Sequence, residues 1–136
     1  KTTNEFNFYN FLIYLLFLQN LILDNLTFNG PSWSVSSEFY VYIDKFPVTE
    51  GHTLFVPVRD EWKCIAACYK AAYERGDSYV NEGYCDGFNV GQNIGEAAGQ
   101  TVMYPHIHLI PRREGDMEDP RGGVRHVIPD KGNYKK

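Results

Sequence analysis

The sequence has little of what marks several common protein classes. It contains three cysteines, an odd number that offers no disulfide framework and favours a reducing, cytoplasmic compartment. Its 17 acidic residues outnumber the 13 basic ones, so the formal net charge is −4. Without a basic excess, the chain has no long-range field to attract nucleic-acid polymers or acidic membrane surfaces. An anionic ligand would have to be held by local groups.

A long apolar run is missing too. Residues 8–23 are the most apolar part, but their unbroken core, residues 11–18, is shorter than the roughly 20 residues that span a bilayer. A secretory signal is disfavoured because no basic region beyond Lys1 and no small-residue cleavage site accompany this core. We expect residues 1–35 to be an apolar segment and turns that pack on the domain or on a second copy. The alternative is a membrane-associated or targeting segment, which would make the chain a tethered interaction protein.

The length of 136 residues suits one domain with one core, and we find no internal repeat or linker. β-Branched and aromatic residues predict strands at residues 38–44, 52–58 and 87–93. A helix is predicted at residues 60–75, capped by Asp60 and followed by a loop at residues 76–85. The side chains at helical spacing on its apolar face are Trp62, Ile65, Ala66, Tyr69 and Ala72 or Tyr73.

The cysteines permit two interpretations. Cys64 and Cys68 lie four residues apart, so they share a face of the predicted helix. A zinc site would combine them with a histidine such as His106, His108 or His126, but no Cys-x-x-Cys spacing supports it. We therefore favour small buried thiols for all of them, Cys85 included.

The most informative stretch is residues 101–110, whose composition predicts a strand that ends at Pro111. Successive side chains of a strand alternate between its faces, so Ile107 and Leu109 would enter the core. Two imidazoles and a phenol on the opposite face favour a reaction site over a packing surface, and two surface histidines on a half-exposed strand are the alternative. The residues expected on that opposite face are Tyr104, His106 and His108.

This stretch resembles the histidine triad (HIT) family of nucleotide hydrolases and transferases. The family motif is His-x-His-x-His followed by two apolar residues, and residues 104–110 match it except that the first histidine is Tyr104. The resemblance extends upstream through residues 93–98 and 44–57, and downstream through residues 112–125. It covers roughly residues 36–129, with separate motifs in the right order.

The resemblance also implies roles. His106 matches the histidine that attacks a nucleotide α-phosphate, and His108 and His52 match phosphate-pocket histidines. Asp44 matches a residue that binds ribose hydroxyls. Asn93 matches a polar residue near phosphate and ribose, and Tyr42 a wall of the base pocket. Further groups expected to contact the nucleotide, from side chains or backbone N–H groups, are Gly99, Gln100, Thr101 and Val102.

Several of these residues have a plainer interpretation. Asp44 could be only a strand-end cap, Asn93 only a turn former and His52 only an exposed strand start. The arginines at positions 112, 113, 121 and 125 are expected to be mostly solvated or paired.

Tyr104 is the main departure from the family pattern. The family's first histidine helps to orient the nucleophile, whereas a tyrosine hydroxyl lies farther from the backbone and does not titrate near pH 7. We therefore expect a weakened triad, whose turnover Tyr104→His would raise. The alternative is a site adapted to the phenol, in which case the same change would lower activity and affinity.

The sequence therefore predicts a HIT-like α+β domain at residues 36–136, with an antiparallel sheet of about five strands, a principal helix and a C-terminal arm. The family resemblance implies a homodimer. The expected activity is hydrolysis or transfer at the α-phosphate of a dinucleoside polyphosphate, such as diadenosine polyphosphate, or of a nucleoside phosphoramidate, with purines favoured. No metal or cofactor is required, although Mg²⁺ could accompany a polyphosphate. A catalytically weakened nucleotide-binding regulatory module is the alternative.

Overall fold

The computed structural model describes residues 36–134, so the predicted apolar segment at residues 1–35 lies outside the described part of the chain. The strands are β1 (Phe39–Ile43), β2 (Thr53–Pro57), β3 (Gly87–Gly91) and β4 (Ile107–Arg112), and the α-helix is α2 (Trp62–Asn81). Three short 3₁₀ turns complete the described elements: η1 (Glu96–Ala98), η2 (Gly123–Val127) and η3 (Pro129–Lys131).

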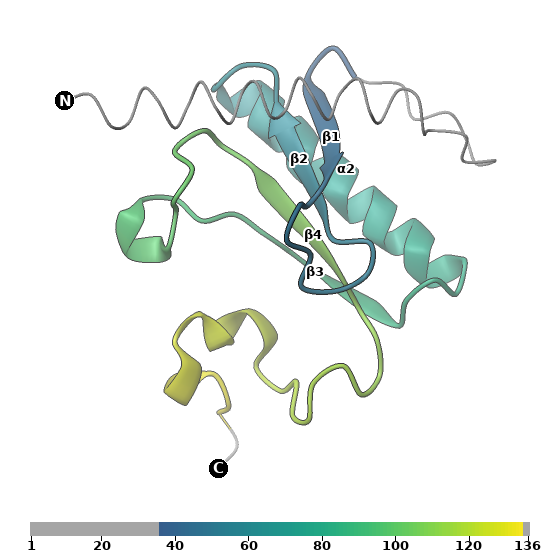
Figure 1. Ribbon diagram of the computed structural model, residues 1–136. Helices are drawn as coiled ribbons and strands as arrows, with labels where there is room; N and C mark the ends of the chain where they lie inside the picture. Colours follow the sequence, from purple (N-terminus) through teal and green to yellow (C-terminus); the bar gives the residue numbers. More distant parts are fainter. Residues whose placement is uncertain (1–35, 135–136) are drawn as a thin grey trace.

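The strands form one antiparallel sheet in the order β1-β2-β4-β3, and α2 lies along one face of it (Figure 1). The predicted α+β architecture is confirmed, with four strands among the described residues where about five were predicted. In the central pairing, Leu54 lies opposite His108. The sheet thereby joins the two sequence motifs that carry the histidines.

The two faces of the sheet have different tasks. Phe55, Ile107 and Leu109 are fully buried against the cysteine and alanine side of α2. Burying such side chains contributes roughly 1.5–3 kcal/mol each. The alternate positions, among them Tyr42 and His108, point to the face that α2 does not cover. Apolar periodicity on one strand face thus places the polar groups together on the other.

The helix differs from its prediction at both ends. It is capped by the backbone at Glu61 with no side-chain bond, not by Asp60, and it continues to Asn81 through the predicted loop. Gly76 lies within the helix. A Cβ at this position would lie 2.5 Å from the nearest ring carbon of Phe88, so the close packing of Phe88 requires glycine. Two residues of the predicted apolar face are instead exposed, namely Trp62 and Tyr73.

The histidine strand is also shorter and later than predicted. β4 begins at Ile107, so Tyr104 and His106 belong to the segment that leads into it. Pro111 does not end β4 but lies inside it, paired with Phe88. A proline is tolerated there because the pairing with β2 has already ended at Leu109, so its missing N–H removes no bond on that side.

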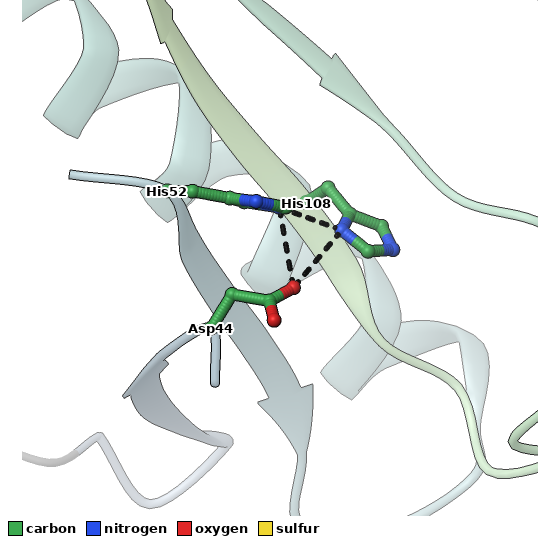
Figure 2. Close-up of side chains that lie close together, drawn as sticks. All are labelled: Asp44, His52 and His108. Carbon is green, nitrogen blue, oxygen red and sulfur yellow. Dashed lines mark hydrogen bonds and ion pairs between the residues drawn. The ribbon is translucent and has the colours of Figure 1, made fainter. Parts of the chain in front are cut away.

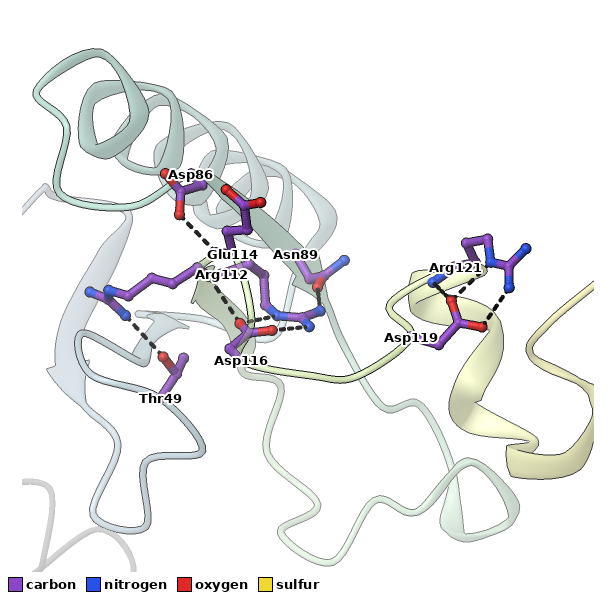
Figure 3. A network of polar contacts seen from close by, with 9 residues as sticks. Thr49, Asp86, Asn89, Arg112, Glu114, Asp116, Asp119 and Arg121 are labelled. Atoms are coloured by element: carbon purple, nitrogen blue, oxygen red, sulfur yellow. Dashed lines mark hydrogen bonds and ion pairs between the residues drawn. The ribbon is translucent and has the colours of Figure 1, made fainter.

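The chain beyond β4 extends away from the sheet as an irregular arm that carries η2 and η3 (Figure 1). Polar contacts fasten its beginning (Figure 3). Arg112 donates to both carboxylate oxygens of Asp116, at 2.8 and 2.7 Å, and to the side chain of Asn89 on β3. Arg113 donates to Thr49, in the connection before β2. These two arginines are paired, as predicted.

In the part of the chain that the structure describes, no helix is both long and apolar enough to cross a membrane. The three cysteines are buried free thiols, as predicted, and none of them belongs to the group of potential metal ligands found in the described part of the chain.

Candidate active site

Asp44, His52 and His108 meet on the face of the sheet that α2 leaves open (Figure 2). His52 Nε2 lies 2.9 Å from His108 Nδ1 and 3.4 Å from Asp44 Oδ2. His108 Nδ1 lies 4.0 Å from the same carboxylate oxygen. His52 is only 3% exposed, so its interpretation as an exposed strand start is wrong.

Hydrogen bonds indicate which nitrogen of each ring carries the proton. The backbone N–H of Val48 donates to His52 Nδ1 at 3.3 Å, so the proton of a neutral His52 ring is on Nε2. That Nε2–H then donates to His108 Nδ1. His108 Nδ1 is therefore an acceptor, and its own proton is on Nε2, the nitrogen that points away from Asp44 in Figure 2. This series of hydrogen bonds leaves the Nε2–H of His108 as a donor directed out of the cluster.

His106 has the opposite arrangement. Its Nδ1 lies 2.9 Å from the backbone carbonyl of Tyr104. A carbonyl can only accept, so His106 Nδ1 carries the proton and Nε2 keeps its lone pair. The rings of His106 and His108 have their centroids 5.1 Å apart. A ring nitrogen with a lone pair and a ring N–H donor are thus present on neighbouring side chains.

Burial sets the charge of two of these rings. It lowers the pKa of His108 from 6.5 to about 4, and the nearby His106 and His52 rings add to this effect. Burial also lowers the pKa of His52, against the opposing attraction of Asp44. Both imidazoles are therefore neutral near pH 7 and act through their tautomers and not as cations.

Asp44 serves two purposes at the end of β1. Its Oδ1 accepts the backbone N–H of Phe46 at 2.8 Å, which is the local turn bond of a strand-end residue. Its Oδ2 faces the two histidines. The plain and the functional interpretations of Asp44 are therefore compatible.

Tyr104 does not lie beside the histidines on one strand, as the sequence predicted. Its hydroxyl instead donates to the backbone carbonyl of Pro57, the last residue of β2, at 2.9 Å. Its ring packs on the cluster of Tyr42 and Val56. Burial raises the pKa of Tyr104, which keeps the phenol a protonated donor. The sequence gave no signal that Pro57 would bond to Tyr104.

Gln100 holds the loop before the histidines together, where the sequence predicted a phosphate donor. It is 9% exposed, its side-chain oxygen accepts from Gly95 N–H at 2.7 Å, and its side-chain amide donates to the carbonyl of Val102 at 3.1 Å. Gly99 is in the left-handed conformation with φ 84°, which favours glycine. Thr101 is exposed at the surface of the same loop.

The last two predicted residues flank this cluster. Asn93 is half-buried and follows β3 by two residues, and Gly91 at the end of β3 pairs with His108. Tyr42 is only 5% exposed, so it belongs to the packed layer beside the site more than to an open wall. Burial and the neighbouring Tyr40 raise the pKa of Tyr42 to about 12. Their contacts with a nucleotide stay predictions.

Relatives of the chain include proteins with named activities. A HIT-like protein of Methanocaldococcus jannaschii is 33% identical over 105 residues, which cover 63% of this chain and 72% of that protein. The adenylylsulfatase HINT3 of Arabidopsis thaliana is 33% identical over 54% of this chain. The bis(5'-adenosyl)-triphosphatase of Dictyostelium discoideum is 33% identical over 59% of it. The chain spans only 41% and 58% of the lengths of these two enzymes.

Solved structures agree with the fold. A zinc-bound histidine triad family protein from Mycobacterium smegmatis matches with a TM-score of 0.57 and 26% identity, over 73% of this chain and 78% of that one. The sequence model of the HIT domain matches residues 35–115, which is more than half of the chain and includes every residue of the cluster described above. This protein therefore belongs to the HIT family.

Proposed function

We propose that the chain is a nucleotide hydrolase or transferase that works through a covalent nucleotidyl-His106 intermediate. One contact carries this proposal: the bond between His106 Nδ1 and the Tyr104 carbonyl, which leaves Nε2 as a lone pair for attack. The same carbonyl stabilises the positive charge that develops on the ring as Nε2 forms its new bond.

In the proposed reaction, His106 Nε2 attacks the α-phosphorus, the P–N bond forms and the bond to the leaving group breaks. His108 Nε2–H donates to a non-bridging phosphate oxygen, where negative charge must be stabilised. His52 supports this step by donating to His108 Nδ1, which holds the ring in the required tautomer. Water then cleaves the P–N bond and releases the nucleoside monophosphate.

The substrate class proposed is an adenine nucleotide anhydride or phosphoramidate, such as a diadenosine polyphosphate. The names of the Arabidopsis and Dictyostelium relatives support an adenosyl group and a scissile bond at phosphorus. Asp44 Oδ2 would accept from ribose hydroxyls, since its Oδ1 is already used by Phe46 N–H. The mechanism needs no metal of its own, and Mg²⁺ would enter only with a polyphosphate.

A homodimer is part of the proposal. β3 stands at one edge of the four-stranded sheet, and Tyr73 on the neighbouring helix is 62% exposed. β3 is an edge strand of the sheet formed by residues 36–134, and its outer edge beside Tyr73 is the surface that we propose pairs with a second copy. Light scattering of the chain in solution tests this part separately.

Intact-protein mass spectrometry tests the chemistry. The chain is incubated with a diadenosine polyphosphate or an adenosine phosphoramidate, quenched in base and measured. We expect an adenylyl adduct on the peptide that contains His106. His106→Ala should lack this adduct. His126→Ala is the matched control, because His126 lies in the arm, where its Nε2 bonds to the carbonyl of Arg121.

A nucleotide-binding module without turnover is the second candidate, because Tyr104 replaces the first histidine of the family motif. Nucleotide binding by calorimetry without any adduct or product would favour this candidate over the enzyme.

A further inference from the structure

We propose that Asp44, His52 and His108 form a binding site for one divalent transition-metal ion of the zinc class. They are the one group of three or more potential metal ligands found among residues 36–134. Their ligand atoms come from three places: the end of β1, the residue before β2, and β4. Figure 2 shows the three atoms directed at one point.

The separations between these atoms suit a tetrahedral ion. Zinc–nitrogen bonds of about 2.05 Å at tetrahedral angles place neighbouring ligand atoms about 3.3 Å apart. The three atoms lie 2.9, 3.4 and 4.0 Å from one another, values on both sides of that spacing. Side-chain movements of a few tenths of an ångström would complete the coordination.

The chemistry of the ligands selects the metal. Two imidazole nitrogens and one carboxylate oxygen suit zinc or cobalt, whereas Mg²⁺ and Ca²⁺ prefer oxygen ligands alone. The proposed ion is therefore different from any Mg²⁺ that a polyphosphate would carry. The side chains of Asp44 and His108 are 16% and 23% exposed, which leaves an approach for the ion and a fourth ligand from solvent.

Binding changes the tautomer of one ring. His52 Nε2 now donates to His108, and it must give up that proton to become a ligand. The proton moves to His52 Nδ1, which ends the 3.3 Å bond from Val48 N–H. Two N–H donors would then face each other, so they must separate and the N–H of the exposed Val48 turns to solvent. The new metal–nitrogen bond has to offset this change.

The ion would also exclude the nucleotide. This part rests on the proposed function, in which Asp44 binds the ribose and His108 the phosphate. A metal that occupies both groups prevents these contacts, so zinc acts as a reversible inhibitor and nucleotide as its competitor.

Calorimetry with Zn²⁺ alone tests the site on the full chain after metal removal. We expect one ion per chain. Asp44→Asn and His52→Asn should each weaken binding at least tenfold, because the first replaces an anionic carboxylate by a neutral amide and the second removes an imidazole nitrogen. His126→Asn, the matched control, should leave binding unchanged. Absence of saturable binding, or equal binding by all variants, would overturn the proposal.

Two measurements on the unaltered chain keep the test independent of variant folding. Co²⁺ should give the visible bands of a tetrahedral nitrogen and oxygen site without a thiolate charge-transfer band, since the three cysteines are buried and outside the cluster. Zn²⁺ should shift the ring nitrogen resonances of His52 and His108. A strong thiolate band, or ring shifts confined to other histidines, would contradict the assignment. Neither measurement involves nucleotide, so failure of the proposed reaction would leave these results interpretable.

Discussion

Tyr104→Phe removes one hydroxyl. It should lower kcat for the proposed reaction with little change in substrate affinity. The Tyr104 hydroxyl donates to the carbonyl of Pro57 at 2.9 Å. The backbone carbonyl of Tyr104 orients His106. Loss of the side-chain bond therefore loosens the group that holds the nucleophile. Tyr104 acts in this scheme as a positioning residue.

The size of the effect follows from the buried carbonyl. Pro57 is fully buried, so its oxygen loses a hydrogen bond that water does not readily replace. An unsatisfied buried acceptor costs about 1–3 kcal/mol, which we expect as lost free energy of unfolding. If about 1.4 kcal/mol of this also raises the barrier by misplacing His106, kcat falls about tenfold.

The assay is steady-state kinetics on an adenosine phosphoramidate, with urea unfolding of the same proteins. Tyr40→Phe is the matched control. Tyr40 packs on the same Tyr42 and Val56 cluster as Tyr104, and loss of the Tyr40 hydroxyl leaves the bond between Tyr104 and Pro57 intact. Tyr104→His should resemble Tyr104→Phe, since the shorter imidazole does not reach Pro57. This expectation differs from the weakened-triad prediction made from the sequence, which stays open. A rise of kcat/KM in Tyr104→His above the natural chain would refute the present reasoning and support the weakened triad.

Four further outcomes are expected. His106→Ala should abolish turnover while nucleotide binding persists in calorimetry, and more than about a tenth of the natural kcat would contradict the assignment. Asp44→Asn, which keeps an oxygen for the turn, should weaken the binding of a ribonucleotide more than that of its 2′,3′-dideoxy analogue. The reason is that each charge-assisted bond to a ribose hydroxyl contributes roughly 1.5–3 kcal/mol. Equal losses of affinity for both ligands would show that Asp44 does not bind the ribose. Folding lowers the pKa of His108 to about 4, so as pH decreases the unfolded chain takes up this proton before the folded chain does. The free energy of unfolding should therefore fall between about pH 6.5 and about pH 4, by about 3 kcal/mol at most. In His108→Asn, urea unfolding should lack this part of the pH dependence. Gly76→Ala should lower the melting temperature, because its methyl would meet the ring of Phe88 and overpacking costs about 1–3 kcal/mol, more than the roughly 1 kcal/mol that alanine gains in a helix; Phe88→Leu should relieve the loss.

Much of the architecture follows from local sequence pattern. Alternating apolar residues predicted that Ile107 and Leu109 would enter the core and that His108 would face away, and the structure confirms this. The strands at residues 38–44 and 52–58 were also predicted to within a residue or two, since β-branched and aromatic runs between turn residues leave few alternatives. The family motif supplied the site residues themselves.

Local pattern failed where a distant contact overrides it. Gly76 was taken as the start of a loop, but packing against Phe88 on β3 makes glycine the residue that keeps α2 in place. Tyr104 was placed on a strand by its neighbours, yet the strand begins only at Ile107 because pairing with β2 reaches no farther than Phe55. Neither the contact of Gly76 with Phe88 nor the end of the pairing at Phe55 can be inferred from residues adjacent in sequence.

The sequence by itself therefore determined which residue types are present and which strand face each one shares. Only the tertiary structure decided the protonation pattern of the site. The tautomer of His52 depends on the N–H of Val48, that of His108 on His52, and that of His106 on a backbone carbonyl. These bonds join residues up to 56 positions apart, and hydrogen-bond geometry, unlike composition, exists only once the sheet has brought them together.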